Sequence, residues 1–205
     1  MKGDWHKKFK QDNRLLIDDK TYENAHSAIL EDLPTYLRHI SKGASVLECC
    51  CGPGYTAVPL SHHFKITAFD KDENILESAK ENAKRFGKDI TFRQLDFFDI
   101  LKEFGKDSFD AVSSGGVLEH FPKKEILKLM DLQLSVAPVV FAQMPLFEPG
   151  EAENNLNPYG IEHYSYSEKD WIDDILSGYN ILEYRVLAEK PKTGRFREFM
   201  AVIGR

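Results

Sequence analysis

Short apolar runs alternate with helical segments along most of this chain, and that alternation limits the fold more than any other feature. Five runs at 44–49, 65–69, 90–95, 109–113 and 136–144 are predicted strands. Helices are expected from Tyr55, over an amphipathic stretch that ends at Gly87, and over 122–134. Strands and helices that alternate at this spacing predict a right-handed, doubly wound α/β fold with a mostly parallel sheet.

The last forty residues break the rhythm. Ser167 and Asp170 have the spacing of a helix N-terminal capping box, and the following residues predict a short helix with an apolar face. Two further strands, 179–189 and 196–204, are separated only by a turn around Gly194, so they are predicted to form an antiparallel hairpin. The expected fold is therefore a seven-stranded sheet in which one strand is antiparallel.

With 205 residues the chain suits one domain with an appendage. Apolar residues at helical spacing through 19–40, interrupted by Pro34, predict an N-terminal helical lid over 1–43. The core is expected over 44–205. Within the core, 145–167 has no clear period and is longer than an ordinary connection, which is typical of a binding segment.

The composition excludes several classes of protein. A net charge of −6 argues against a broad nucleic-acid-binding surface. The sequence contains no apolar stretch long enough to span a membrane, and no apolar leader region follows the basic N-terminal residues. We expect a cytoplasmic protein with no membrane or nucleic-acid partner. The only cysteines, Cys49, Cys50 and Cys51, are adjacent and lack CxxC spacing, so no metal is expected and a buried strand end is the simpler interpretation.

The turn after the first predicted strand has the spacing of a nucleotide-binding loop. Gly52, Gly54 and Ala57 satisfy the G-x-G-x-x-G/A pattern, in which glycine lets the backbone turn sharply and approach a ligand. This pattern alone is weak and also fits an NAD(P)-dependent oxidoreductase. Glu48, immediately before the loop, would repel a pyrophosphate but suits an ammonium or sulfonium group.

Two more acids follow the next two predicted strands. Asp70 is placed to accept hydrogen bonds from ribose hydroxyls, and Asp96 is placed within reach of an adenine amino group. Because parallel strands end at one edge of a sheet, Glu48, Asp70 and Asp96 are expected to share a crevice. Simpler roles for the two aspartates are helix capping at Asp70 and turn formation at Asp96.

Four stretches, VLECCCGPG, ITAFDKDENILESAKENAK, LDFFD and FDAVSSGGVLEHF, resemble the motifs of class I S-adenosylmethionine-dependent methyltransferases of the small-molecule type. The resemblance covers about 45–205 and implies the strand order 3-2-1-4-5-7-6. It implies cofactor contacts by Glu48, Cys50, Gly52, Gly54, Asp70, Lys71, Asp96, Phe97 and Ser114. Cys50 stands where the family commonly has a glycine, and we expect it to be tolerated if its φ angle is negative.

A small organic acceptor is expected by elimination, because the chain shows no basic groove with stacking aromatics and has Ser113-Ser114-Gly115-Gly116 where the family's signature for amino-nitrogen targets would stand. His120 and His163 are the candidate bases, although methyl transfer can proceed by orientation and desolvation alone. Tyr22, Phe147, Tyr159 and Tyr164 are the expected wall of the acceptor pocket, with simple packing as the alternative for each ring. Two other functions stay open at this point, an NAD(P)-dependent oxidoreductase and a non-catalytic nucleotide-binding scaffold of the same fold.

Overall fold

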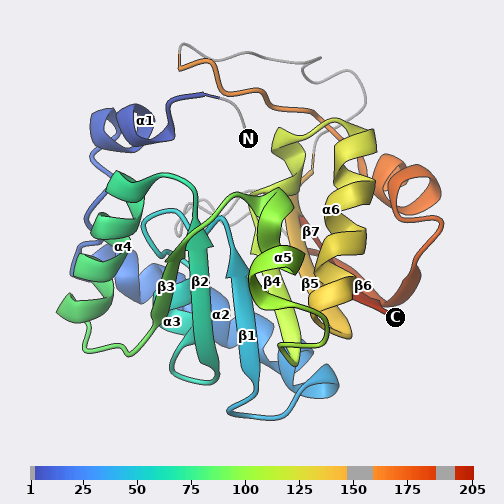
Figure 1. Cartoon of the computed structure of the whole chain (residues 1–205), viewed down its shortest axis with the longest axis horizontal. Coiled ribbons are helices and arrows are strands. Elements are labelled where there is room, and N and C mark those ends of the chain that lie inside the picture. The colour runs from blue at the N-terminus through green and yellow to red at the C-terminus, as the bar shows by residue number, and fades with distance from the viewer. Residues whose placement is uncertain (1–2, 147–158, 188–196) are drawn as a thin grey trace.

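The computed structural model describes residues 3–146, 159–187 and 197–205. A seven-stranded sheet in the order β3-β2-β1-β4-β5-β7-β6 crosses the molecule (Figure 1). The strands are β1 (Ser45–Cys49), β2 (Lys65–Asp70), β3 (Thr91–Gln94), β4 (Ala111–Gly115), β5 (Val139–Pro145), β6 (Asn180–Leu187) and β7 (Glu198–Gly204). Strand β7 is antiparallel to both of its neighbours, and the other pairings are parallel. The predicted fold and strand order are confirmed.

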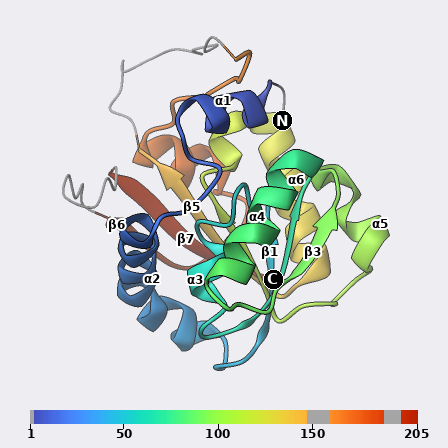
Figure 2. The same ribbon diagram turned by 90° about the vertical axis from the view of Figure 1, so that its left-hand side faces the viewer.

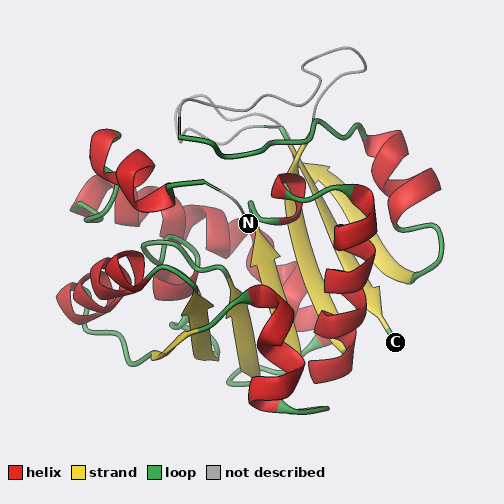
Figure 3. Cartoon of the chain, turned by 45° about the horizontal axis from the view of Figure 1, so that its top comes forward, coloured by secondary structure: helices red, strands yellow, loops and turns green. Residues whose placement is uncertain are grey.

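Helices cover both faces of the sheet. They are α1 (Trp5–Gln11), α2 (Asp19–His39), α3 (Ala57–Leu60), α4 (Glu73–Arg85), α5 (Ile100–Phe104), α6 (Lys123–Val136) and a π-helical segment (Asp170–Ile175). One apolar cluster joins the sheet to α2, α3 and α4, and the other joins it to α5, α6 and the π-helical segment. Figure 1 shows α2 behind the sheet and α5 and α6 in front, and Figure 3 shows the helices around the yellow strands.

The central strands form where the sequence is apolar on both sides. Four of the five residues of β1 are buried, as expected for a parallel strand between two helical layers. Helix α4 buries Ile75, Leu76, Ala79 and Ala83 on one side, and Asp72 caps its first turn through the Asn74 N–H at 2.9 Å. The helix expected from Tyr55 is shorter than its pattern predicted, because only Ala57–Leu60 are α-helical.

Helix α2 does not form a lid. It continues through Pro34 to His39 and packs on one face of the sheet, where the Tyr36 ring lies 4.2 Å from that of Phe141. Asp32, only 2% exposed, pairs with Arg185 of β6 at 2.5 Å. The N-terminal segment 1–43 is therefore not one unit: α2 belongs to the core, and the part before it lies over the carboxyl ends of the strands, as Figure 2 shows for α1.

The chain between α1 and α2 is held to α4 by a single side chain. Asn82 is fully buried, and its Oδ1 accepts the Ile17 N–H at 2.9 Å while its Nδ2 donates to the carbonyls of Leu15 and Pro53. A buried amide that satisfies three backbone groups fixes both the N-terminal segment and the glycine turn. None of the described helices is long and apolar enough to cross a membrane.

Candidate active site

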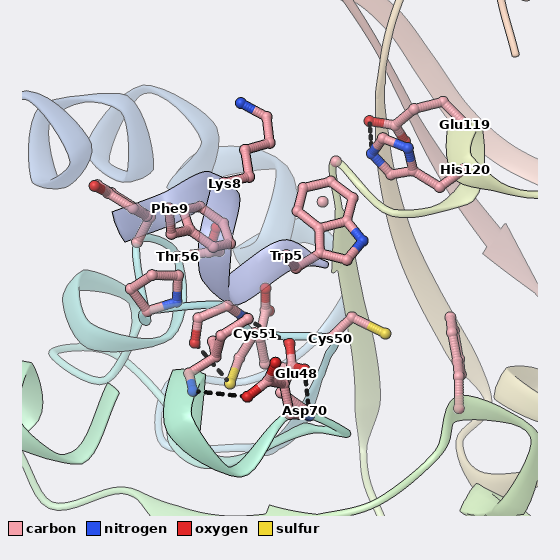
Figure 4. Close-up of a pocket in the computed structure, with 18 of the residues that line it drawn as sticks. Trp5, Lys8, Phe9, Glu48, Cys50, Cys51, Thr56, Asp70, Glu119 and His120 are labelled. Atoms are coloured by element: carbon pink, nitrogen blue, oxygen red, sulfur yellow. Dashed lines mark hydrogen bonds and ion pairs between the residues drawn. The ribbon is translucent and has the colours of Figure 1, made fainter. Parts of the chain in front are cut away.

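A cavity of 770 Å³ opens at the carboxyl ends of the parallel strands, beneath α1 (Figure 4). Its walls come from the N-terminal segment, the ends of β1, β2, β3, β4 and β5, the turn after β4, and the residues around the start of β7. Its lining includes Trp5, Lys8, Phe9, Glu48, Cys50, Gly52, Asp70, Lys71, Asp96, Phe97, Gly115, Gly116, Glu119, His120, Phe121, Pro145, Leu146, His163, Arg197 and Glu198. Ligand sites of open α/β sheets occur at this edge.

The glycine turn after β1 has the conformation that only glycine adopts without strain. Gly52 has φ +54° and Gly54 has φ +93°. A Cβ atom on Gly54 would lie 3.0 Å from Val58 Cγ2, and one on Gly52 would face the Phe9 ring at 3.5 Å. The turn therefore brings bare backbone to the cavity, with α1 lying over it.

Cys50 corrects one expectation. A negative φ angle was expected at this position, but Cys50 has φ +50°. A left-handed residue with a side chain costs about 1–2 kcal/mol relative to the right-handed region. Cys50 therefore adopts the conformation of the glycine that it replaces, and the thiol lines the cavity.

Asp70 is tied to the glycine turn. Its carboxylate accepts the Gly52 N–H at 3.1 Å through Oδ2 and the Asp72 N–H at 3.1 Å through Oδ1. Burial raises the pKa of Asp70, and the hydrogen bonds from Asp72 and Gly52 lower it in part. Helix α4 is capped by Asp72 instead, so the capping alternative for Asp70 is wrong.

Glu48 is the most unusual electrostatic feature of the cavity. It is 2% exposed, and its Oε2 has no hydrogen-bond partner among the described residues. Burial raises the pKa of Glu48 to about 8, although a hydrogen bond from Ser113 lowers it in part. A buried carboxylate without a cation is costly, so the site favours a positively charged ligand group.

The two residues that the sequence predicts to contact adenine lie after β3. Asp96 lines the cavity, and its Oδ1 accepts the Phe98 N–H at 3.0 Å, so it also caps the turn that follows. Phe97 is 3% exposed and packs edge-on against the rings of Phe69 and Phe121. Lys71 lines the cavity beside Asp70.

Ser114 does not have its expected place. It is fully buried within β4, and the next two residues, Gly115 and Gly116, line the cavity instead. Gly116 has φ +66°, which lets the chain turn away from the strand end. The main chain that faces the cavity here is therefore one residue later than the sequence predicted.

The two histidines of the sequence prediction meet at the opposite end of the cavity. Their rings lie 5.3 Å apart, and Trp5 packs edge-on against His120 at 4.7 Å. His120 Nδ1 lies 2.8 Å from the Glu162 carbonyl oxygen, which can only accept, so Nδ1 carries the proton. Burial lowers the pKa of His120 to about 4, so the ring is neutral at pH 7 and Nε2 carries a lone pair.

None of the three tyrosines predicted for the acceptor wall is among the residues that line the cavity in the described part of the chain. Tyr22 stacks on Phe86 at 3.9 Å and hydrogen-bonds His62, on the side of the molecule where α2 meets α4. Tyr164 stacks on Tyr166, and Tyr159 accepts the Asp4 N–H through its carbonyl. Phe147 lies outside the described residues.

Comparison with known proteins agrees with this geometry. A family model described as a methyltransferase domain matches residues 46–136, which span β1 to α6 and hold the glycine turn, Asp70 and Asp96. This domain match agrees with the sequence resemblance to the class I S-adenosylmethionine-dependent methyltransferases. The sequence resemblance to that family is thereby confirmed.

Solved structures share the fold of this methyltransferase. Magnesium protoporphyrin IX methyltransferase from Synechocystis PCC 6803, with bound S-adenosylhomocysteine, has a TM-score of 0.70 at 19% identity, over 97% of this chain and 94% of that chain. The 1,6-didemethyltoxoflavin-N1-methyltransferase of Burkholderia thailandensis has a TM-score of 0.71 at 16% identity, over 98% and 85%.

Among curated sequences, ribosomal RNA small subunit methyltransferase H from Rickettsia massiliae is 25% identical over 174 residues, which is 77% of this chain. The chain spans about half the length of the curated relatives it matches, 52% in that case.

Several cavity residues of the methyltransferase were not predicted. Glu119 is 4% exposed beside His120, and burial together with the charge of Glu198 raises its pKa to about 8. The signal available in the sequence was the position of Glu119 among the apolar residues of VLEHF. Arg197 and Glu198 come from a distant part of the chain, and no local pattern marks them.

The cysteine run is a strand end, as the simpler interpretation held. Cys49 is fully buried, and burial raises the pKa values of all three thiols, so none is a ready thiolate. Within the described ranges, no group of three or more His, Cys, Asp or Glu side chains is arranged to hold a metal ion.

Proposed function

We propose that this methyltransferase binds S-adenosylmethionine in the cavity and transfers its methyl group to a small organic acceptor. The observation that carries the cofactor assignment is Glu48, a buried carboxyl group with an unpartnered oxygen next to a glycine turn. The methionyl end of S-adenosylmethionine brings an ammonium group, which would offset the cost of ionising Glu48 in the interior.

The other cofactor contacts follow the strand ends. Asp70, with Lys71 beside it, would accept hydrogen bonds from the ribose hydroxyls. The two backbone hydrogen bonds that the carboxylate already accepts leave lone pairs on both of its oxygens. Asp96 and Phe97 would border the adenine. Gly52 and Cys50 would lie under the cofactor, whereas Gly54 shapes the turn without lining the cavity, and Gly115 and Gly116 would take the place given to Ser114.

The chain's own groups support a direct displacement. His120 Nε2 would accept a proton from the acceptor nucleophile, whose electron pair forms the bond to the methyl carbon. The electrons of the broken C–S bond stay on sulfur, so the product is a neutral thioether. Trp5 and Phe121 help to wall this end, which limits water around the reacting atoms.

A small acceptor is favoured over a polymer by the walls of the cavity. Trp5, Phe121, Pro145 and Leu146 provide apolar surface, and His163 borders the same end. The last three belong to the 145–167 segment and support its proposed place on the acceptor side. The net charge of −6 would oppose an RNA backbone. Because the Rickettsia relative is a ribosomal RNA methyltransferase, RNA is the alternative acceptor against which a small molecule should be tested.

Calorimetry tests the cofactor assignment. We expect S-adenosylhomocysteine to bind, NAD and NADP not to bind, and S-adenosylmethionine affinity to fall about tenfold or more in Glu48→Gln, since a charged hydrogen bond contributes about 1.5–3 kcal/mol. Glu103→Gln, at an exposed position of α5, is the matched control. NAD binding without S-adenosylhomocysteine binding would refute the proposal.

A second assay addresses the acceptor. Labelled S-adenosylmethionine is incubated with the enzyme and either a small-metabolite extract or purified 16S RNA, and the labelled product is separated by size. Label in low-mass products is the expected result. Label only in RNA would replace the small acceptor with a polymer. Cofactor binding with no transfer to either pool would favour a non-catalytic scaffold.

A further inference from the structure

The acceptor end of the cavity holds a second buried acid that the cofactor does not need. Glu119 follows the turn after β4 and lines the cavity near His120, and Figure 4 draws this pair beside Trp5 and apart from Glu48 and Asp70. The Glu119 side chain is 5% exposed. Its Oε2 has no hydrogen-bond partner among the described residues. A buried carboxyl group with an unpartnered oxygen is destabilising unless a ligand supplies the missing hydrogen bond.

The surroundings of Glu119 hold it in the neutral form. Burial opposes the ionisation of Glu119 and the nearby Glu198 adds a like charge, whereas a hydrogen bond from its own backbone N–H lowers the pKa only in part. His120 does not supply a cation, because its pKa is lowered to about 4. The Glu119 Oε1 to His120 Nε2 distance of 3.8 Å is therefore a contact between two neutral groups at pH 7 and not an ion pair.

These surroundings fix which groups at this end of the cavity carry protons. The Glu162 carbonyl fixes the His120 proton on Nδ1, so Nε2 is an acceptor. A neutral Glu119 carries one O–H donor. The Trp5 indole N–H is also buried and has no hydrogen-bond partner within the described ranges, which adds a second donor. Two donors and one acceptor suit a ligand that gives up one proton and presents an oxygen with lone pairs beside it.

We propose that Glu119 binds the acceptor directly, donating its carboxyl O–H to a carbonyl-type oxygen adjacent to the hydroxyl that His120 deprotonates. The acceptor class is thus a hydroxyl compound with a neighbouring carbonyl oxygen, such as an aromatic ring that carries the two groups on adjacent carbons. The hydroxyl proton goes to His120 Nε2, the oxygen electron pair bonds the methyl carbon, and the C–S electrons stay on sulfur. Glu119 keeps its proton throughout. This inference rests on the proposed function.

Two isomers test the recognition, both measured by calorimetry on the protein saturated with S-adenosylhomocysteine at pH 7. The probes are 2-hydroxyacetophenone, with hydroxyl and carbonyl on adjacent carbons, and 4-hydroxyacetophenone, with the groups apart. We expect the first to bind at least about tenfold more tightly. Equal binding of the two isomers, tighter binding of the second, or binding of neither overturns the proposal. Failure of S-adenosylhomocysteine itself to bind would instead refute the proposed function.

Variants separate a binding role from a structural one. Glu119→Gln keeps a donor and should retain the preference for 2-hydroxyacetophenone, whereas Glu119→Leu should lose it, with S-adenosylhomocysteine affinity unchanged in both. In the wild type the preference should fade above pH 8 as Glu119 ionises, and in Glu119→Gln it should persist. Glu103→Gln, exposed on α5, is the control and should behave as the wild type. A pH profile shared by wild type and Glu119→Gln would overturn the proposal.

Discussion

The backbone N–H of Gly52 donates to Asp70 Oδ2 across 3.1 Å, and this bond joins the glycine turn after β1 to the acid that ends β2. Parallel pairing of β1 with β2 brings the two residues to the same edge, because Cys49 is in register with Phe69. The acid therefore orders the loop before any ligand arrives. Such a preformed loop reduces the entropy lost on binding.

Removal of the Asp70 carboxylate should affect two interactions at the proposed cofactor site. We expect Asp70→Ala to weaken S-adenosylmethionine binding by about 1–3 kcal/mol, because ribose hydroxyls and the Gly52 N–H lose a buried acceptor. Calorimetry on the purified variant measures the change. Asp99→Ala, at an exposed position after β3 that does not line the cavity, serves as the control. Unchanged affinity in Asp70→Ala would remove this residue from the site.

The left-handed Cys50 should respond to substitution in an order set by backbone strain. Relief of about 1–2 kcal/mol in Cys50→Gly is partly offset by the greater freedom of glycine in the unfolded chain, about 0.5–1 kcal/mol. We expect thermal unfolding of Cys50→Gly at or slightly above the wild-type temperature. Cys50→Val should unfold at a lower temperature, because a β-branched residue is poorly tolerated there. A valine variant as stable as the glycine variant would contradict the strain.

The stability of the ligand-free protein should fall as the pH rises from 6.5 to 8. Glu48 and Glu119 keep their protons up to a pKa of about 8 when folded, whereas the reference value is 4.5, so the unfolded chain binds fewer protons in this window. His120, with its pKa lowered to about 4, acts in the opposite direction only below pH 6.5. We expect a loss on the order of 2 kcal/mol, seen as a lower unfolding temperature in calorimetry.

The double variant Glu48→Gln with Glu119→Gln is the control for that slope. Neither amide titrates, so its unfolding temperature should stay nearly level between pH 6.5 and 8. A level wild-type profile would show that one or both acids are ionised in the folded protein.

Deletion of residues 1–12 should leave a folded protein with an open cavity. Helix α1 has no buried residue, whereas Ile17 and α2 are held by Asn82 and by the Asp32–Arg185 pair. We expect the unfolding temperature to fall by only a few degrees. Acceptor-analogue binding should fall much more than S-adenosylhomocysteine binding, since Trp5 and Lys8 are removed from the wall. Global unfolding of this variant would show that α1 is part of the core.

Local patterns were sufficient for the architecture. The apolar runs of β1 and β2, the spaced glycines and the short C-terminal hairpin each have a conformational requirement that acts over a few residues. Asp70 and Glu48 were predictable as cavity residues because strand ends of a parallel sheet meet at one edge. Cys50 was mispredicted because sequence cannot show that its neighbours impose a positive φ angle.

The sequence by itself determined the seven-stranded α/β fold, the place of the cofactor loop and the acids that follow its strands. Only the tertiary structure decided which distant residues face the cavity: it brought Trp5, Glu119 and Glu198 to one end, and moved Tyr22 to a packing site against Phe86. It also set the charge of Glu48, Glu119 and His120. Protonation depends on burial and on neighbours remote along the chain, and no local pattern encodes either.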